Sequence, residues 1–222
     1  MRQFDDLTYV HSVNVALIAS ILGQWLKFSE KDIRILTISG LLHDIGKIMI
    51  PNEILTKPGK LTVAEYNIMK QHVNFGYEKV KNQNIDIRIK EACLLHHEKC
   101  DGTGYPFGLK SDHIPAVAKI IAIADVYDAM TSARVYRGAL CPFEVIDTMY
   151  KDAFTKFEPE YILPFLKNVA SSYINNDVRL SDGRIGKVVL INENALSLPI
   201  VQCEDEFIDL SKTRGLTVSA IL

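Results

Sequence analysis

Histidine and aspartate side chains recur in the first part of the chain in a pattern that could bind metal. Five of the six histidines belong to this pattern. The residues concerned are His11, His43, Asp44, His72, His96, His97 and Asp125. Neutral imidazole and carboxylate together are typical ligands of first-row divalent metals. Seven ligands exceed the needs of one ion, so the pattern predicts two metals that share a bridging carboxylate, which suits phosphoester hydrolysis.

Two pairs of adjacent residues predict where this site forms. His43 and Asp44 end an apolar helix in the string GLLHDIGK. Adjacent helical residues point about 100° apart, so both can reach one site only at a frayed helix end. Asp44 is the natural bridging ligand because a carboxylate can give one oxygen to each metal. His96 and His97 repeat the arrangement before a second turn.

The remaining residues of the pattern are weaker signals when taken singly. Asp125 and Asp128 lie three apart and share a helix face, so one could ligate while the other orients a histidine. His11 or His72 alone would more often be a packed or surface histidine. His113 fits no pattern, and we take it as such a residue. Joint occurrence of the others favours a metal site over coincidence.

Residues 1–172 are predicted to be helical, which gives a mainly α fold class. Ser29 is expected to cap one helix. Residues 62–65 have capping-box form and are predicted to open a helix that runs to about Lys81. A loop is expected over 47–62, and further helices over 85–97 and from Pro115, which can occupy a first turn.

The character of the chain changes near residue 172. Two β-rich runs flank Asp182-Gly183, a strong hairpin signal, and three more short runs follow. We therefore divide the chain into a helical domain, residues 1–172, and a small antiparallel β unit, residues 176–222, that could form a five-stranded barrel. The β unit shows no catalytic pattern and is interpreted as a docking or packing module.

Composition limits the classes of function. The chain has 222 residues and a net charge of -2, so a broad surface for a nucleic-acid polymer is not expected. Four cysteines without CxxC spacing favour reduced thiols. The first residues lack a signal-peptide pattern, and no apolar run is long enough for a membrane span. We expect a cytoplasmic protein without membrane contact.

Four strings make the chain resemble the HD-GYP domain, a bacterial subgroup of the HD metal-dependent phosphohydrolases. They are HDIGKIMIPNEILTKPGKLT at 43–62, QHVNFGYE at 71–78, HHEKCDGTGYP at 96–106 and IIAIADVYDAMTSARVYR at 120–137. The resemblance implies an HD-type helical bundle around a metal centre. It also implies a signalling phosphodiesterase that hydrolyses cyclic di-GMP to the linear dinucleotide or on to GMP, by attack of a metal-bridging hydroxide. Iron is the usual metal, and manganese is also used.

The resemblance assigns roles to individual residues. It implies one metal bound by His11, His43, Asp44 and Asp125, and a second bound by Asp44, His72, His96 and His97. Lys47 is similar to the family lysine that faces a substrate phosphate, and with Asp44 it forms the catalytic pair. Arg134 and Arg137 resemble the family's phosphate-binding basic pair. Some members hold a third metal through a glutamate, and Leu7 stands at that position here, so we expect two metals.

The string at 96–106 implies a loop that borders the cleft and can recruit protein partners. Its residues are Asp101, Gly102, Gly104, Tyr105 and Pro106. Cys100 beside it is read as an inert thiol rather than a redox switch. Two alternatives stay open: a cyclic dinucleotide-binding module with little turnover, and an HD-type hydrolase of another nucleotide. Homodimer formation and protein partners at the loop or β unit also stay open.

Overall fold

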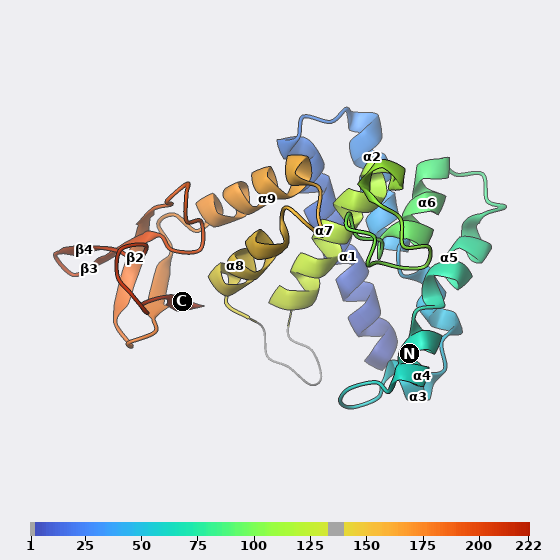
Figure 1. Cartoon of the computed structure of the whole chain (residues 1–222), viewed down its shortest axis with the longest axis horizontal. Helices are drawn as coiled ribbons and strands as arrows, with labels where there is room; N and C mark the ends of the chain where they lie inside the picture. Colours follow the sequence, from blue (N-terminus) through green and yellow to red (C-terminus); the bar gives the residue numbers. More distant parts are fainter. Residues whose placement is uncertain (1–2, 133–139) are drawn as a thin grey trace.

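The computed structural model describes residues 3–132 and 140–222, with side chains from Thr8 onward. It consists of a helical bundle with a small β-sheet at one end (Figure 1). The mainly α fold class with a C-terminal antiparallel sheet is therefore confirmed. The helices are α1 (Gln3–Trp25), α2 (Glu30–Leu42), η1 (Ile45–Met49), α3 (Asn52–Leu55), α4 (Val63–Met69), α5 (His72–Val80), α6 (Ile87–Leu95), η2 (Ser111–His113), α7 (Ala116–Thr131), α8 (Pro142–Asp152) and α9 (Pro159–Ser172).

Helix α7 forms the centre of the bundle. It contacts α1, α2, α6, α8 and α9. Its buried residues lie on almost every side of the helix, as expected for a helix enclosed by others. Ile120, Ile121 and Ile123 are fully buried in one hydrophobic cluster with residues of the surrounding helices. Asp125 and Asp128 are buried on this same helix, so the core positions two carboxylates in the interior.

Local capping signals are confirmed, but the helix predicted over 62–81 is two helices. Ser29 accepts a hydrogen bond from the Asp32 backbone N–H. Thr62 and Glu65 form the expected capping box. The chain then breaks between α4 and α5, where the Nδ1–H of His72 donates to the Met69 carbonyl oxygen at 2.8 Å. Lys70 and Gln71 between the two helices keep right-handed helical dihedral angles, but the Gln71 N–H bonds to the Ile68 carbonyl oxygen, three residues back, so the α-helical hydrogen-bond pattern is interrupted there.

The prediction of a loop over 47–62 is wrong for its first half. Residues 45–49 form the 3₁₀ helix η1, and residues 52–55 form the single turn α3 after Pro51. A proline restricts the preceding residue but suits the start of a helix, so Pro51 separates the two turns without preventing the second. Pro115, expected in a first turn, lies one residue earlier at the N-cap of α7.

The C-terminal strands are β1 (Asp177–Leu180), β2 (Ile185–Leu190), β3 (Ile200–Cys203), β4 (Glu206–Asp209) and β5 (Val218–Ile221). They form one antiparallel sheet in the order β4-β3-β2-β1-β5. Gly183 adopts φ +94° in the hairpin between the first two strands, as the Asp182-Gly183 signal predicts. β4 and β5 are the edge strands, so the described strands form an open sheet rather than the barrel considered from the sequence.

The sheet lies beside α8 and α9 (Figure 1), and α8 contacts β5. Buried residues of the sheet, such as Val178 and Val201, belong to the same hydrophobic cluster as Phe143 of α8. The division at 172–176 therefore coincides with a change of secondary structure but not with a gap in the core. Within the described ranges, no helix is long and apolar enough to cross a membrane.

Candidate metal centre

The structure brings all seven predicted ligands together at one place in the bundle. Five helices supply them: α1 carries His11, His43 and Asp44 directly follow α2, His72 opens α5, His96 and His97 follow α6, and α7 carries Asp125. Their possible ligand atoms form two groups, and within each group all of these atoms lie within 4.8 Å of one another. One group contains Asp44, His72, His96 and His97, and the other contains His11, His43 and Asp125. Apart from Asp44, which the family resemblance assigns to both metals, this division agrees with the two ligand sets that the resemblance implies.

Asp44 lies between the two groups of histidines. Its Oδ1 is 3.3 Å from His72 Nε2 and 3.9 Å from His96 Nε2. Its Oδ2 is 3.2 Å from His43 Nε2 and 3.6 Å from His11 Nε2. Each carboxylate oxygen thus faces a different pair of imidazoles. This geometry allows one oxygen to bind each of two metals.

The end of α2 explains how two adjacent residues reach the same site. His43 is the C-cap of the helix, and Asp44 has left helical geometry with φ -98° and ψ 9°. The following turn, η1, packs directly on α5, because a Cβ at Gly46 would lie 1.9 Å from the His72 carbonyl oxygen and 2.4 Å from Gly76 N. Only glycine allows this approach of two backbones.

Three of the histidines are oriented by backbone carbonyls. His43 Nδ1 contacts Gly40 O at 2.7 Å, His72 Nδ1 contacts Met69 O, and His96 Nδ1 contacts Ala92 O at 2.9 Å. A carbonyl oxygen only accepts, so in each ring Nδ1 must carry the hydrogen. Nε2 is then left with its lone pair directed at the other ligands, as metal-binding histidines require.

Burial keeps several of these rings neutral. It lowers the pKa of His72, lowers that of His96 well below its usual value, and lowers that of His97 to about 3. Burial opposes ionisation of Asp44, but Lys47, His43 and His72 together hold its pKa well below the usual range. Neutral imidazoles around ionised carboxylate are the protonation states needed for metal binding.

His11 is held by a second carboxylate rather than by the backbone. Its Nδ1 lies 2.6 Å from Asp128 Oδ2, and its Nε2 lies 3.1 Å from Asp125 Oδ1. Burial lowers the pKa of His11, but the hydrogen bonds to the two aspartates outweigh it and raise the pKa to about 9. Asp128 also accepts hydrogen bonds from Asn14 Nδ2 and Ser132 Oγ, both at 2.9 Å. Asp128 therefore orients a histidine, which is one of the two arrangements open from the sequence.

The residues present fit divalent cations. His43 Nε2 and Asp44 Oδ1 are buried and make no hydrogen bond with any atom in the described part of the chain. Buried polar atoms without partners are costly, and coordination to a metal would satisfy both. The donors are imidazole nitrogens and carboxylate oxygens, which suit ions such as Fe²⁺ and Mn²⁺.

Lys47 lies on η1 beside Asp44, with its Nζ 2.5 Å from Asp44 Oδ2. It is the cation nearest to Asp44 among the described ion pairs. The side chain is about one quarter exposed, so it can also be reached from outside. Arg134 and Arg137, predicted to bind phosphate, lie outside the described residues.

The loop after α6 packs on the histidines. Gly102 adopts φ +82°, and a Cβ at Gly104 would lie 2.4 Å from Lys99 N, so both glycines are required by the turn. Asp101 accepts hydrogen bonds from the backbone and hydroxyl of Thr103. The ring of Tyr105 lies 4.7 Å from that of His97, and a cis bond joins it to Pro106.

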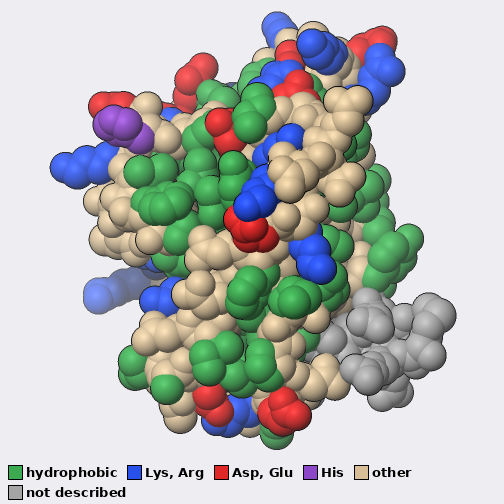
Figure 2. All heavy atoms as spheres, turned by 90° about the vertical axis from the view of Figure 1, so that its right-hand side faces the viewer, with side chains coloured by type: hydrophobic (Ala, Val, Ile, Leu, Met, Phe, Trp, Pro, Cys, Tyr) green, Lys and Arg blue, Asp and Glu red, His purple; other side chains and the backbone are tan. Residues whose placement is uncertain are grey.

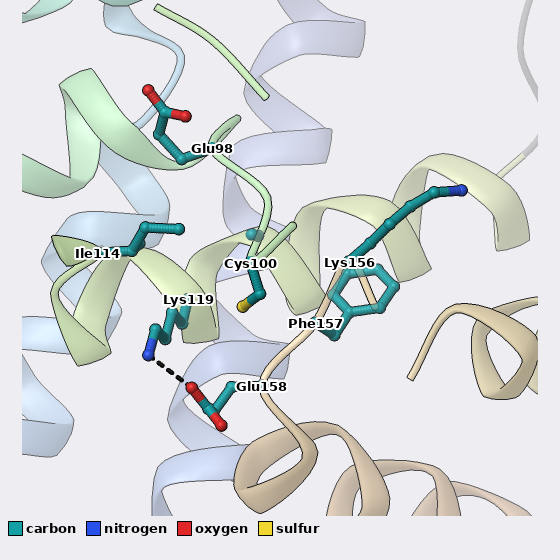
Figure 3. A pocket seen from close by; sticks show the side chains of 8 residues that line it. Glu98, Cys100, Ile114, Lys119, Lys156, Phe157 and Glu158 are labelled. Atoms are coloured by element: carbon teal, nitrogen blue, oxygen red, sulfur yellow. Dashed lines mark hydrogen bonds and ion pairs between the residues drawn. The ribbon is translucent and has the colours of Figure 1, made fainter. Parts of the chain in front are cut away.

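Glu98 braces this loop from inside. It is 4% exposed, and its carboxylate accepts from the backbone N–H groups of Phe107, Gly108 and Leu109 at 2.7, 3.1 and 2.9 Å. Figure 3 shows Glu98 near Cys100, with the ion pair of Lys119 and Glu158 on the other side of the thiol. Burial raises the pKa of Cys100, which agrees with its interpretation as an inert thiol.

Sequence reasoning missed Asn14, Ser132 and Glu98. Ser132 lies four residues after Asp128, so helical spacing could have suggested their contact. Asn14 lies 114 residues from Asp128, and no local signal reveals that pairing. Glu98 directly follows the histidine pair but carries no spacing signal of its own. His113, set aside from the pattern, is exposed on η2.

Comparison with known proteins defines the class of the chain. The family model described as HD domain matches residues 5–161, so the chain belongs to the HD domain family. A structural relative, the HDG"Y"P protein Bd1817 from Bdellovibrio bacteriovorus, is 22% identical with a TM-score of 0.59 and covers 71% of this chain and 50% of its own. This likeness shows the fold.

Curated relatives place the chain within the family more closely. A protein named cyclic di-GMP phosphodiesterase from Pseudomonas aeruginosa is 36% identical over 91% of this chain and 49% of its own length. A 3'3'-cGAMP-specific phosphodiesterase from Vibrio cholerae is 36% identical over 70% of this chain and 30% of its own. The HD-GYP resemblance is thereby confirmed. The chain spans about half or less of the length of these relatives.

Proposed function

We propose that this chain is the catalytic part of a metal-dependent phosphodiesterase that hydrolyses cyclic di-GMP. The observation that supports the proposal most strongly is the position of Asp44, whose two oxygens face two separate pairs of histidines. That arrangement suits two ions held side by side, and two such ions suit attack on a phosphodiester. The relatives named as cyclic dinucleotide phosphodiesterases supply the substrate class.

Each residue of the site would have a separate role in binding the metals or the substrate. Asp44 would join the two sites, and the other six ligands would complete them, with iron or manganese as the ions. When bound, the ions would lower the pKa of a water molecule and neutralise charge on the phosphate. Lys47 places a further cation beside Asp44, where it can bind a phosphoryl oxygen. Asp128 keeps Nε2 of His11 directed at the site.

Specificity among cyclic dinucleotides is a separate question, because relatives of similar identity are named for cyclic di-GMP and for 3'3'-cGAMP. We favour cyclic di-GMP, and the linear dinucleotide or GMP as product. A binding module with little turnover is the second candidate function, but a complete set of seven ligands is not required for binding alone.

The test is turnover by protein prepared with Fe²⁺ or Mn²⁺ under reducing conditions. We expect about two ions per chain, and release of linear dinucleotide from cyclic di-GMP in preference to 3'3'-cGAMP. Asp44→Asn should reduce kcat by orders of magnitude and lower the metal content. Near-normal activity of Asp44→Asn with two ions still bound would refute the bridging assignment. Tight binding of cyclic di-GMP without product would instead support the binding module.

A further inference from the structure

A lysine without a carboxylate partner stands beside the metal centre. Lys70 lies in the break between α4 and α5, two residues before His72. Its Nζ is 5.3 Å from the centroid of the Tyr66 ring and 5.9 Å from that of the Tyr105 ring. The side chain is half-buried. Cation–π contacts of this kind orient an ammonium group.

The two tyrosines connect Lys70 to the histidines. Their ring centroids lie 6.5 Å apart, with Tyr66 on α4 and Tyr105 on the loop after α6. The Tyr105 ring is 4.7 Å from His97 and 6.4 Å from His72. Tyr66 is 48% exposed. Lys70 therefore lies against both rings of an aromatic row that starts at the metal ligands and reaches the surface at Tyr66.

The charge of Lys70 is not neutralised by the described residues. No carboxylate oxygen of that part of the chain lies within 4 Å of its Nζ, whereas nearby Lys57 contacts Glu65 at 2.6 Å and Lys81 contacts Glu78 at 2.6 Å. Aromatic rings attract a cation but do not cancel its charge. The ammonium group is thus both oriented and available to an anion.

The surface around Lys70 is not positively charged overall. The face that carries α4, α5 and α6 shows acidic and basic side chains of both signs between hydrophobic ones (Figure 2). The whole chain has a net charge of -2. An anionic ligand must therefore be held by individual cations, and their placement decides which ligand fits.

We propose that Lys70 binds the second phosphate of a cyclic dinucleotide, the one that is not hydrolysed. This inference rests on the proposed function. A cyclic dinucleotide carries two phosphates in one small ring, so when one lies at the metal centre beside Lys47 the other must lie away from the metals. Lys70 offers a cation at the rim on the side of His72 and His97. A substrate with one phosphate would not reach it.

The test compares two substrates in the metal-loaded protein. Cyclic di-GMP carries both phosphates, and bis(p-nitrophenyl) phosphate carries one. Lys70→Met keeps the length and the packing on the tyrosine rings but removes the charge. We expect KM for cyclic di-GMP to rise by about tenfold to a hundredfold, the usual range for losing a charge-assisted hydrogen bond. We expect kcat to change by less than about twofold, and hydrolysis of bis(p-nitrophenyl) phosphate and metal content to stay as in the wild type.

Three further variants complete the design. Lys70→Arg keeps the positive charge and should restore most of the affinity. Lys70→Gln gives a second uncharged side chain if the methionine variant is insoluble. Lys79→Met is the matched control, because Lys79 is exposed on α5 and makes no ion pair among the described residues. Its kinetics should equal those of the wild type with both substrates.

The outcomes separate this inference from the proposed function. An unchanged KM for cyclic di-GMP in Lys70→Met, with wild-type turnover intact, overturns the Lys70 assignment alone. An equal loss with both substrates also overturns it, because the effect would then lie at the metals. A wild-type protein that hydrolyses bis(p-nitrophenyl) phosphate but neither binds nor cleaves any cyclic dinucleotide overturns both proposals.

Discussion

Replacing Glu98 with glutamine should destabilise the protein although the two side chains have the same shape. Glutamine keeps one acceptor oxygen, which can serve Phe107 and Gly108. Its amide nitrogen then faces the N–H of Leu109, where the carboxylate oxygen accepts at 2.9 Å. A flipped amide would place its nitrogen against two N–H groups instead. At least one buried donor is therefore left without an acceptor.

The expected cost follows from these contacts. Losing one hydrogen bond to a charged group costs about 1.5–3 kcal/mol, and the other two weaken as the charge is removed. Glu98 is 4% exposed, so water cannot replace the lost acceptor. A total near 3 kcal/mol corresponds to a fall in Tm of roughly 6–12 °C for a chain of this size.

Calorimetry and amide hydrogen exchange measure the two parts of this prediction. Tm should fall, and the amides of residues 107–109 should exchange faster. Glu91→Gln is a suitable control, since Glu91 lies on α6, the helix before Glu98, and makes no side-chain hydrogen bond among the described residues. A Glu98→Gln protein with Tm within about 2 °C of the wild type, and with unchanged exchange at those amides, would show that the carboxylate does not brace the loop.

Three other changes test separate parts of the structure. Asp128→Asn removes the charge behind His11 and should weaken metal binding on the order of tenfold, measured by metal titration of the folded variant; unchanged affinity would contradict the orienting contact. Gly104→Ala places a Cβ against backbone atoms and should lower the free energy of unfolding, measured in urea, by about 1–3 kcal/mol. Gly59→Ala is the control: it has open space around the new Cβ, so it should show only the cost of its positive φ. A chain ending at Ser172 should keep its metals but lose stability, because the sheet shares a hydrophobic cluster with the helices; a soluble, folded truncation without metal would refute the domain division.

The ligands and caps could be predicted from the sequence because their signals are local. A histidine beside an aspartate, a histidine pair, and a Thr62-to-Glu65 box are each visible within a few residues. The structure places the seven predicted ligands in two neighbouring groups, with the possible ligand atoms of each group within 4.8 Å of one another, although their binding of metal stays a prediction. The helical bundle was expected from the family resemblance, and the sheet from the β-rich runs around Asp182-Gly183.

What could not be predicted depends on contacts across the fold. Asn14 meets Asp128 only because α1 packs on α7. Lys70 reads as an ordinary surface lysine until Tyr105 is brought to it from the loop after α6.

The backbone contact at Gly46 affects how related sequences should be classified as active or inactive. Because η1 touches α5 without room for a Cβ, any side chain at this position would push Lys47 and Asp44 away from His72. A protein could then keep all seven metal-binding side chains and still lack a working centre. An inventory of histidines and aspartates would count such a degenerate copy as active, so genome surveys should also require glycine two positions after the aspartate.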